Sequence, residues 1–533
     1  MEGFSIMKIK LKKIMIPIVL AAMLMSGCAQ TVDTSVEETA QVDEQKDNSV
    51  DVIRLATEDW GQPSPFTHYS RGPGSFKMQM VFDSLLERDE KGLIPWMAKS
   101  YQISEDGLEY TFLINDGIKW HDGQDLTLED IKFSFDYFVQ HPPVSNAATF
   151  GGKEFIKDIR LGENNEITFV LEKKSAIALE TIGKVRIIPK HIWENVADPN
   201  AFMGPKAVIG CGPYKLIDYN MEQATYEFEA FENYYGPKPL VKKVQFAPVS
   251  DSVLAFENEE IDMIGIGSDL LDRYKSDSTY KVIENPAFWG YRLVFNMEKR
   301  PEFKDVKTRQ AVAYALDINE MIEKIERGAA KPGSSGYLPP DHVWYNKDVP
   351  KYDFDLEKSK ELLEGKQINV DFLVGNSSNE IKLAELMKIS LEKVGIIINI
   401  KPADTKTRDA AVKNGDFEMA IIGHGGWGAD ANMLKTSFFS GNKSSGSVTT
   451  NVIPGYENDA IKELGEQQAS EMDVEKRKEM IFEMQKLIGE DLPMIALYYT
   501  SGYTVYRPEK YDGWMNMFDH HSLEHSKLSY LQR

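Results

Sequence analysis

Hydrophobic and polar positions follow two different periods along most of the chain after residue 50. Apolar and polar residues alternate at residues 50–57, as in a strand with one buried face. Residues 368–374 and 395–401 also have the pattern of strands, and residues 380–394 between them have the period of an amphipathic helix. This alternation of strand and helix predicts an open α/β sheet, in which ligands bind at the carboxyl ends of the strands.

A second patterned segment, residues 106–138, predicts two short strands followed by a helix. Thr127 and Asp130 have the spacing of a capping box, which marks the start of that helix. His121 and Asp122 come just before the helix, and one interpretation is a catalytic pair. Because a glycine follows Asp122, a turn explains these two residues better than catalysis does.

An apolar run at residues 417–422 leads into a glycine-rich segment that includes His424, Gly425, Trp427, Gly428 and Asp430. Glycine-rich turns let the backbone approach another surface closely. Trp427 offers a flat apolar wall, and Asp430 is a single carboxylate with no cation near it in the sequence. A wall with one fixed charge suits an amphipathic ligand that has a positive end. The alternative is a tight connection between a strand and a helix, with Asp430 as the N-cap.

The loop after the first predicted strand contains two aromatic residues, Trp60 and Phe66, and two prolines. Loops that follow strand ends are common positions for ligand contact. Both aromatic residues are therefore candidates for a binding site. The alternative for each of them is packing within the core.

The N-terminal segment has the features of a secretory signal. Lysines at positions 8, 10, 12 and 13 precede an apolar run at residues 14–25, which is shorter than the ~20 residues that span a bilayer. The ending Ser-Gly-Cys resembles the signal of bacterial lipoproteins, which implies cleavage before Cys28 and a lipid on its sulfur. A plain secretory peptide and an anchor helix are the alternatives, and Met7 is an alternative start. The polar and acidic residues 28–50 predict a disordered tether.

Composition restricts the function further. The 533 residues are 42% hydrophobic and 27% charged, which is typical of globular chains, and the length predicts two or more domains. A formal net charge of -22 argues against nucleic acid as a partner, because phosphate contacts need a basic surface. The sequence has two cysteines, so a lipidated Cys28 leaves Cys211 without a disulfide partner. No histidine or basic residue is adjacent to Cys211, which favours a packed residue over a nucleophile.

The sequence does not contain a familiar set of catalytic residues. The motifs of serine hydrolases, zinc peptidases, phosphate-binding loops and dinucleotide-binding folds are missing. We therefore expect a protein that is not an enzyme, with no catalytic residues and no cofactor. A secreted hydrolase is the alternative from a different functional class.

Several blocks of the sequence resemble one protein family, in the order in which the family has them. Residues 110–135 look like the signature of the family 5 extracellular solute-binding proteins, with a strand, a Trp-His-Asp-Gly turn and a Leu-Thr-Leu-Glu-Asp-Ile helix start. These proteins are the peptide and nickel receptors of ATP-binding-cassette (ABC) importers. Residues 210–214, 233–236 and 309–317 are similar to further blocks of the family, with Cys211 in place of a common hydroxyl residue.

The resemblance implies an α/β fold of two lobes, the periplasmic-binding-protein-like fold of type II, with an extra subdomain in lobe 1 and a two-segment hinge. The implied divisions are a signal peptide at 1–27, a tether at 28–50, lobe 1 at 51–290 with the extra subdomain at about 80–190, lobe 2 at 291–497, and a return to lobe 1 at 498–533. The lobes are expected to be joined near residues 289–295 and 496–499. They are expected to close on a ligand held between them.

In the peptide-binding members, an aspartate at the position that Asp430 matches takes the α-ammonium group of the peptide. Asn432 and Met433 stand where the family has Asp-Pro, so this role stays open. The candidate ligand-binding residues are Trp60, Phe66, Trp289, Tyr291, His424, Gly425, Trp427, Gly428 and Asp430.

The resemblance also implies a monomeric, lipid-anchored receptor on the extracytoplasmic face of the cell membrane. Its expected partners are a peptide ligand and the permease and ATPase subunits of an ABC importer. A nickel or metal-chelate receptor is the alternative, with the metal held by a small chelator, by His424 or by the tail histidines. We expect no metal site in the tail, because terminal histidines are usually solvated. His521 and His525 would share a transition metal only if the tail is helical.

Overall fold

Five β-sheets organise the part of the chain that the computed structural model describes, residues 49–144, 156–425, 427, 428, 430–438 and 453–533. These residues belong to one compact unit, Asn48–Arg533. The predicted lipidation site Cys28, the signal and nearly all of the tether lie outside the described residues. Among the described helices, none is both long enough and apolar enough to cross a bilayer.

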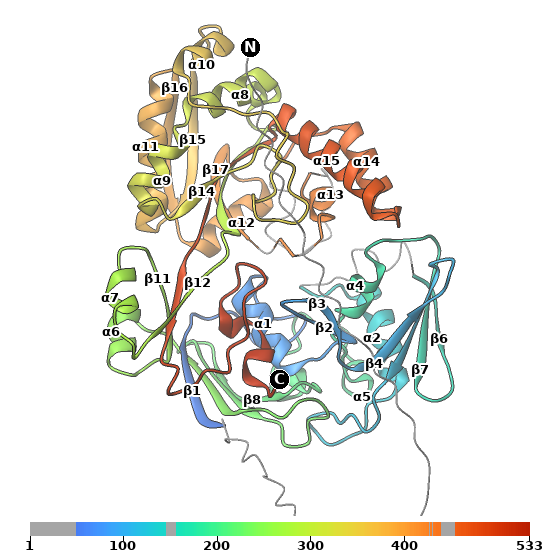
Figure 1. Ribbon diagram of the computed structural model, residues 1–533. Helices are drawn as coiled ribbons and strands as arrows, with labels where there is room; N and C mark the ends of the chain where they lie inside the picture. The colour runs from blue at the N-terminus through green and yellow to red at the C-terminus, as the bar shows by residue number, and fades with distance from the viewer. Residues whose placement is uncertain (1–48, 145–155, 426, 429, 439–452) are drawn as a thin grey trace, which may run out of the picture. The chain divides into compact units, whose positions relative to one another are not determined.

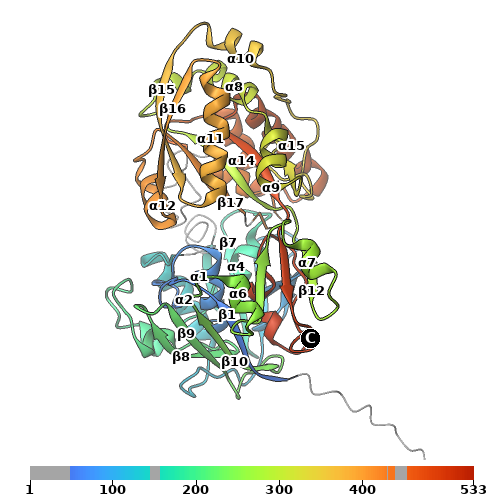
Figure 2. The same cartoon turned by 90° about the vertical axis from the view of Figure 1, so that its left-hand side faces the viewer.

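Three of the sheets form the framework of the first lobe, lobe 1, drawn below the six-stranded sheet in Figure 1. β1 (Val50–Ala56) confirms the predicted first strand and pairs in parallel with β10 (Val241–Ala247). Figure 2 shows β10 beside β9 (Thr225–Ala230) and β8 (Tyr214–Asn220) in the same sheet. The second sheet has the order β4 (Ala98–Ile103), β5 (Glu109–Ile114), β7 (Glu166–Leu171), β6 (Ile156–Leu161), and the third pairs β2 (Leu86–Asp89) with β3 (Gly92–Pro95).

One helix of this part begins at the local signal that the sequence predicts. At the start of α2 (Leu128–Gln140), the Asp130 carboxylate accepts the backbone N–H of Thr127 at 2.8 Å, which confirms the predicted cap. The other helices here are α1 (Gly72–Val81), α4 (Ala178–Gly183), α5 (Lys190–Trp193), α6 (Ser252–Glu257) and α7 (Leu271–Lys275).

A six-stranded sheet forms the second lobe, lobe 2. Its order is β14 (Ala330–Pro332), β18 (Met494–Thr500), β13 (Trp289–Phe295), β17 (Met419–His424), β15 (Ile368–Gly375), β16 (Ile396–Ala403). β15 pairs in parallel with both β16 and β17, as the alternation of strand and helix predicts. Figure 1 shows α9 (Ile318–Glu326) and α11 (Ser378–Glu392) on one side of this sheet, and α14 (Asp459–Ser470) and α15 (Val474–Asp491) on the other. The remaining helices are α8 (Val306–Ala315), α10 (Leu356–Leu363), α12 (Thr405–Asn414) and α13 (Met433–Ser437).

Each lobe has its own hydrophobic core, and a smaller cluster packs under the sheet of β11 (Met263–Ile266), β19 (Tyr503–Tyr506) and β12 (Lys281–Glu284). The core of lobe 1 includes Trp514 and Tyr530 from the C-terminal tail. The chain joins the small sheet to lobe 2 at residues 285–288 and 501–502. These two crossings are bonded to each other, because the Asn285 backbone N–H donates to the Gly502 carbonyl at 2.8 Å.

His121 and Asp122 contact different partners, which confirms the interpretation of this segment as a turn. The Nε2 atom of His121 lies 2.9 Å from the Gly212 carbonyl oxygen, and burial lowers the pKa of this histidine to about 4. Asp122 instead pairs with Nε2 of His191 at 2.8 Å. The two side chains therefore hold neighbouring segments in place.

The Gly210-Cys211-Gly212 block packs directly against the end of α1. A Cβ atom at position 210 would lie 2.0 Å from the Val81 carbonyl oxygen, so only glycine fits there. Cys211 is fully buried, and burial raises the pKa of its thiol well above the usual value. This confirms the prediction that Cys211 is a packed residue.

Candidate ligand-binding site

The glycine-rich segment starts at the carboxyl end of β17, where two aromatic rings lie against its backbone. A Cβ atom at Gly423 would lie 2.5 Å from the indole of Trp289, and one at Gly425 would lie 2.5 Å from the ring of His520. Trp289 belongs to lobe 2 and His520 belongs to the C-terminal tail. The glycines are therefore required because side chains from two different parts of the molecule approach this strand end closely.

Trp427 is a core residue of lobe 2, so the expectation that it forms an exposed wall is wrong. Its side chain is 2% exposed, and its indole N–H donates to the carbonyl oxygen of Phe288. The rings of Tyr337 and His424 pack edge-on against it, with centroid distances of 4.9 Å and 4.5 Å. This aromatic cluster leaves no face of the indole open to a ligand.

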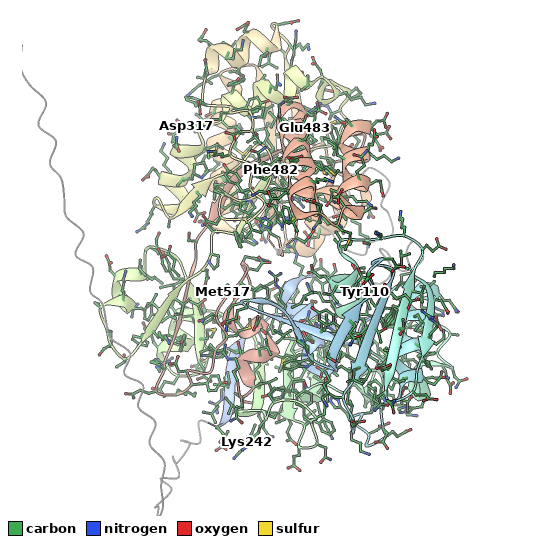
Figure 3. All side chains as sticks on the ribbon, turned by 45° about the vertical axis from the view of Figure 1, so that its right-hand side comes forward. Tyr110, Lys242, Asp317, Phe482, Glu483 and Met517 are labelled. Carbon is green, nitrogen blue, oxygen red and sulfur yellow. The ribbon has the colours of Figure 1, made fainter. Side chains whose placement is uncertain are left out.

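Asp430 has a cationic partner, contrary to the expectation of an isolated carboxylate. Arg477 Nη1 donates to Asp430 Oδ2 at 2.6 Å, and Nη2 donates to Oδ1 at 2.7 Å. Arg477 lies on α15, the helix on which Phe482 and Glu483 are labelled in Figure 3. The Asp430 side chain keeps 23% of its surface exposed, so one edge of the ion pair faces solvent.

The alternative prediction, that Asp430 is the N-cap of the following helix, is also wrong. α13 starts after Asn432, and no side chain caps its first turn. The Asp430 Oδ1 atom instead accepts the backbone N–H of Asn432 at 2.7 Å, which closes a turn. Asp430 therefore fixes the loop locally as well as pairing with α15.

The two aromatic residues of the loop after β1 have different environments. Phe66 is buried against Trp193 and Phe138, with centroid distances of 5.1 Å and 5.6 Å. Phe66 is thus a core residue, and its assignment to ligand contact is wrong. Trp60 is half-buried and lies 5.7 Å from the ring of Tyr69. Trp60 remains available at the surface of this loop.

Asp59 holds the same loop in shape. Its Oδ1 atom accepts the Tyr219 hydroxyl at 2.7 Å and the backbone N–H of Gly61 at 3.1 Å. Burial raises the pKa of Asp59, but these hydrogen bonds outweigh burial and hold the pKa below its usual value. The carboxylate therefore stays ionised, and the loop is fixed by charge-assisted bonds.

The three other aromatic candidates lie at the adjoining ends of β13 and β17, two central strands of the lobe 2 sheet. Trp289 is half-buried, whereas Tyr291 is buried and packs edge-on against it at 4.8 Å. His424 is also buried and stacks on Tyr337 at 5.7 Å. Both ring nitrogens of His424 lack a hydrogen-bond partner among the described residues, and burial lowers its pKa well below the usual value.

An ion pair that the sequence does not predict joins the two lobes. Arg71, just before α1 of lobe 1, donates from Nε to Asp409 Oδ2 at 2.8 Å and from Nη2 to Oδ1 at 2.6 Å. Asp409 lies on α12 of lobe 2 and is buried. Behind it, Arg408 Nη2 lies 3.6 Å from Asp409, and Arg408 Nη1 donates to Glu380 at 2.7 Å.

The C-terminal tail also contacts lobe 2. The backbone N–H of Gly428 donates to Asp519 Oδ2 at 3.0 Å. Figure 3 labels Met517, two residues earlier in the tail, on the side of lobe 1 that faces lobe 2. The guanidinium of Arg88 lies 4.4 Å from the ring centre of Phe518, which fixes the tail on β2.

The tail histidines are not on an α-helix. His521 and His525 were expected to share a metal only if the tail is helical, so that condition is not met. Leu523–His525 form one turn of 3-10 helix that starts after Ser522. The rings of His521 and His525 are still close, with a centroid distance of 5.7 Å. Burial lowers the pKa of His521 to about 4, so its ring is neutral at pH 7. The tail histidines are therefore packed rather than solvated.

A cavity of about 260 Å³ lies where these parts meet. Its lining includes Gly72 and Arg88 of lobe 1, Gly428 of lobe 2, and Asp519, His521 and His525 of the tail. A larger cavity of about 430 Å³ is lined by residues of lobe 2 alone and shares no residue with the first. Of the predicted ligand-binding residues, Gly428 is the one in the lining of the smaller cavity.

The fold and this site define the class of the protein. Two α/β lobes, two bonded crossings and a cavity lined from both lobes are the features of a two-lobed, periplasmic-binding-protein-like receptor. Residues 92–446 match the family described as bacterial extracellular solute-binding proteins, family 5 Middle. The chain belongs to this family.

Relatives and solved structures agree with this class. A relative from Brucella ovis is 29% identical over 354 residues, which cover 63% of this chain and 64% of the relative, so the match spans under two thirds of that protein. The dipeptide-binding protein of Escherichia coli K12 is 26% identical over 65% of this chain and 70% of its own length. The structure of DppA from Helicobacter pylori in complex with the peptide STSA has a TM-score of 0.78 and 21% identity, covering 91% of this chain and 99% of that one.

Proposed function

We propose that this chain is the extracytoplasmic substrate-binding component of an ABC importer, which captures peptides between its lobes and delivers them to a membrane permease. Membership in the solute-binding family supports the receptor role. The peptide ligand is supported by the dipeptide-binding relative and by the peptide-bound structural neighbour. In this proposal the peptide is bound and released unchanged, so the protein is not an enzyme.

The observation that carries this proposal is the set of groups that lobe 1 and lobe 2 present around one cavity. Lobe 2 contributes the backbone of Gly428, and the tail and lobe 1 contribute Asp519, Gly72 and Arg88. A ligand that contacts both sides binds the closed arrangement more tightly than an open one. Closure about the two crossings is therefore driven by the ligand itself.

We propose that the exposed edge of Asp430 receives the α-ammonium group of the peptide. Oδ1 accepts both Arg477 and the backbone N–H of Asn432, whereas Oδ2 accepts Arg477 and has a second lone pair for the ligand. An ammonium group on the exposed edge would complete a charge-assisted network. Half-buried Trp60 and Trp289, and the backbone at Gly425 and Gly428, are proposed as the neighbouring contacts.

Calorimetry with matched peptides tests this assignment. The peptide that copurifies with the protein is identified by native mass spectrometry and is then titrated in free and N-acetylated form. Acetylation removes the ammonium charge, so we expect a loss of roughly tenfold or more in affinity, corresponding to about 1.5–3 kcal/mol. In the Asp430→Asn variant, the two forms should bind with similar affinity.

Asp416→Asn is the matched control, because Asp416 is an exposed carboxylate of lobe 2 that forms an ion pair with Lys299 at 3.3 Å. This control should keep the full effect of acetylation. An acetylation effect of the same size in the wild type and in Asp430→Asn would remove Asp430 from the amine site. Recovery of shortened peptides would contradict binding without conversion.

We also propose that the mature chain is anchored to the membrane by a lipid on Cys28, and that its lobes divide at the crossings 285–288 and 501–502, a few residues from the expected boundaries after residues 290 and 497. The sequence ending Ser-Gly-Cys supports the anchor, and the two separate hydrophobic cores support the division. Mass spectrometry of the membrane fraction should find a lipid-modified N-terminal cysteine. A Cys28→Ser variant should lose this modification and leave the membrane, and an unchanged distribution would contradict the anchor.

A further inference from the structure

The cavity between the lobes has more cationic than anionic groups in its lining, although the whole chain has a formal net charge of -22. Among the described residues, its carboxylates are those of Glu87 and Asp519. Its cationic side chains are those of Arg88, Lys184, Arg186 and Lys527. The lining histidines add no charge at pH 7, because burial lowers the pKa of His521 to about 4 and that of His525 well below its usual value. Such a cavity in an acidic protein favours a ligand with a negative group.

Most of these cations already have a carboxylate partner in lobe 1. The ion pairs are Lys184–Glu180, Arg186–Glu87 and Lys527–Asp83. Arg88 differs from them, because its guanidinium forms no ion pair with any residue that the structure describes. A half-buried guanidinium beside a cavity is unfavourable without a counterion, so this side chain is the one that calls for an anion from the ligand.

The position of the Arg88 side chain suits this role. Its guanidinium carbon lies over the ring of Phe518, 4.4 Å from the ring centre. A contact with an aromatic face takes up no oxygen acceptor, so the N–H groups at the edge of the guanidinium stay available. Their planar fork matches the two oxygens of a carboxylate.

Arg88 is also close to the loop that carries the proposed amine site. A Cβ atom at Gly428 would lie 3.7 Å from Nη1 of Arg88 and 4.0 Å from the backbone nitrogen of Asp430. An extended peptide spans about 3.3–3.6 Å per residue, so the two positions are within roughly two to three residues' length of each other. A peptide with its amine on Asp430 would therefore bring a group of its first three residues to Arg88.

We propose that Arg88 binds a carboxylate of the peptide, so that the protein selects peptides with a negative charge within their first three residues. This inference rests on the proposed peptide-binding function. The carboxylate has two sources, the carboxyl terminus of a di- or tripeptide and an acidic side chain near the amino terminus. Both offer the same two oxygens to the guanidinium, so the experiment has to separate them.

Calorimetry with two pairs of synthetic peptides tests this role. The first pair is Ala-Ala-Ala with a free and with an amidated carboxyl terminus, and the second is the amides of Ala-Glu-Ala and Ala-Gln-Ala. In the wild type, the charged member of at least one pair should bind about tenfold or more tightly than the neutral member. A preference in the first pair assigns the carboxyl terminus to Arg88, and one in the second pair assigns the side chain. In Arg88→Gln the preference should fall below about twofold, and Arg88→Lys should restore part of it, because lysine keeps the charge without the fork.

Arg160→Gln is the matched control, because Arg160 is an exposed arginine of lobe 1 that pairs with Glu109. It should keep the full preference for charged peptides. Each variant is measured on both members of a pair, so a general loss of stability does not imitate the expected result. Peptides that bind regardless of charge, or a preference that survives in Arg88→Gln, would overturn this inference and leave the proposed function intact. Failure of every peptide to bind the wild type would contradict the proposed function, and this inference with it.

Discussion

Two aspartates of lobe 2 each bind an arginine through both carboxylate oxygens, but in different settings. Asp430 binds Arg477 of the same lobe, at 2.6 Å and 2.7 Å. Asp409 binds Arg71 of the other lobe, at 2.8 Å and 2.6 Å. Because the two ion pairs have nearly the same chemistry, any difference between their effects on stability and on lobe closure comes from their locations.

The two pairs differ in the surroundings of their charged groups after each pair is broken. Arg477 also donates to the Gln468 carbonyl and side-chain oxygens, so it is held within lobe 2 in any arrangement of the lobes. Arg71 would become solvated if the lobes separated, and Asp409 would keep Arg408 nearby at 3.6 Å. The first pair should therefore stabilise the folded lobe, and the second should stabilise the closed arrangement.

The largest expected effect is on stability, in the variant Arg477→Met. Removing the buried Arg477 guanidinium takes away the donors to Asp430 Oδ2 and to the side-chain oxygen of Gln468. We expect the free energy of unfolding of lobe 2 to fall by about 3–5 kcal/mol, as measured by urea denaturation. Lys476→Met is the control on the same helix, because Lys476 is exposed. A loss below about 1 kcal/mol would show that this pair is not a structural element.

The next effect is on closure, in the variant Arg71→Gln. We expect a change of about 1.5–3 kcal/mol in the equilibrium between closed and open arrangements, because the lost bonds are charge-assisted. Peptide affinity should then fall roughly tenfold or more, and small-angle X-ray scattering of the ligand-free protein should show a larger radius of gyration. The melting temperature should change little, because Asp409 keeps Arg408.

Lys413→Gln provides the control for this variant, because Lys413 is an exposed residue on the same helix, α12. It should leave both scattering and affinity unchanged. If Arg71→Gln lowered the stability of the protein as much as Arg477→Met does, the assignment of the two pairs to different roles would be wrong.

The elements that carry these residues were predictable from local pattern. Residues 380–394 have a helical period and 395–401 alternate, and the structure has α11 and β16 at these places. The capping box of Thr127 and Asp130 also follows from neighbours in the sequence. In each case the physical cause acts over a few residues, so a single sequence contains it.

The contacts of the site were not predictable, because they join distant parts of the chain. Asp430 and Arg477 are 47 positions apart, and Arg71 and Asp409 are 338 positions apart. Nothing next to Asp430 indicates that α15 will bring an arginine to it. The burial of Trp427 has a similar reason, since periodicity does not tell which way a side chain points in an irregular, glycine-rich segment. In that segment only the tertiary packing against Tyr337 and Phe288 decides the orientation.

The smallest expected effect on peptide affinity comes from a second ion pair between the lobes, which is more exposed. Comparing the two pairs separates the contribution of burial from that of joining the lobes. Lys406 of α12 lies 3.6 Å from the Asp59 carboxylate, so this pair joins nearly the same two segments as Arg71 and Asp409. Its side chains are 50% and 26% exposed, whereas those of Arg71 and Asp409 are 19% and 2% exposed. Exposed pairs contribute about 0–1 kcal/mol, so Lys406→Gln should change peptide affinity by less than about fivefold.

Peptide affinity measured at several salt concentrations provides a second test of this prediction, because salt screens exposed charges far more than buried ones. The small effect of Lys406→Gln should vanish at high ionic strength, whereas the effect of Arg71→Gln should largely remain. If the two variants lost the same affinity at every salt concentration, any charge pair between the lobes would serve equally well, and the burial of Asp409 would not matter. A difference that persists in high salt would assign the stabilisation of the closed arrangement to the buried pair.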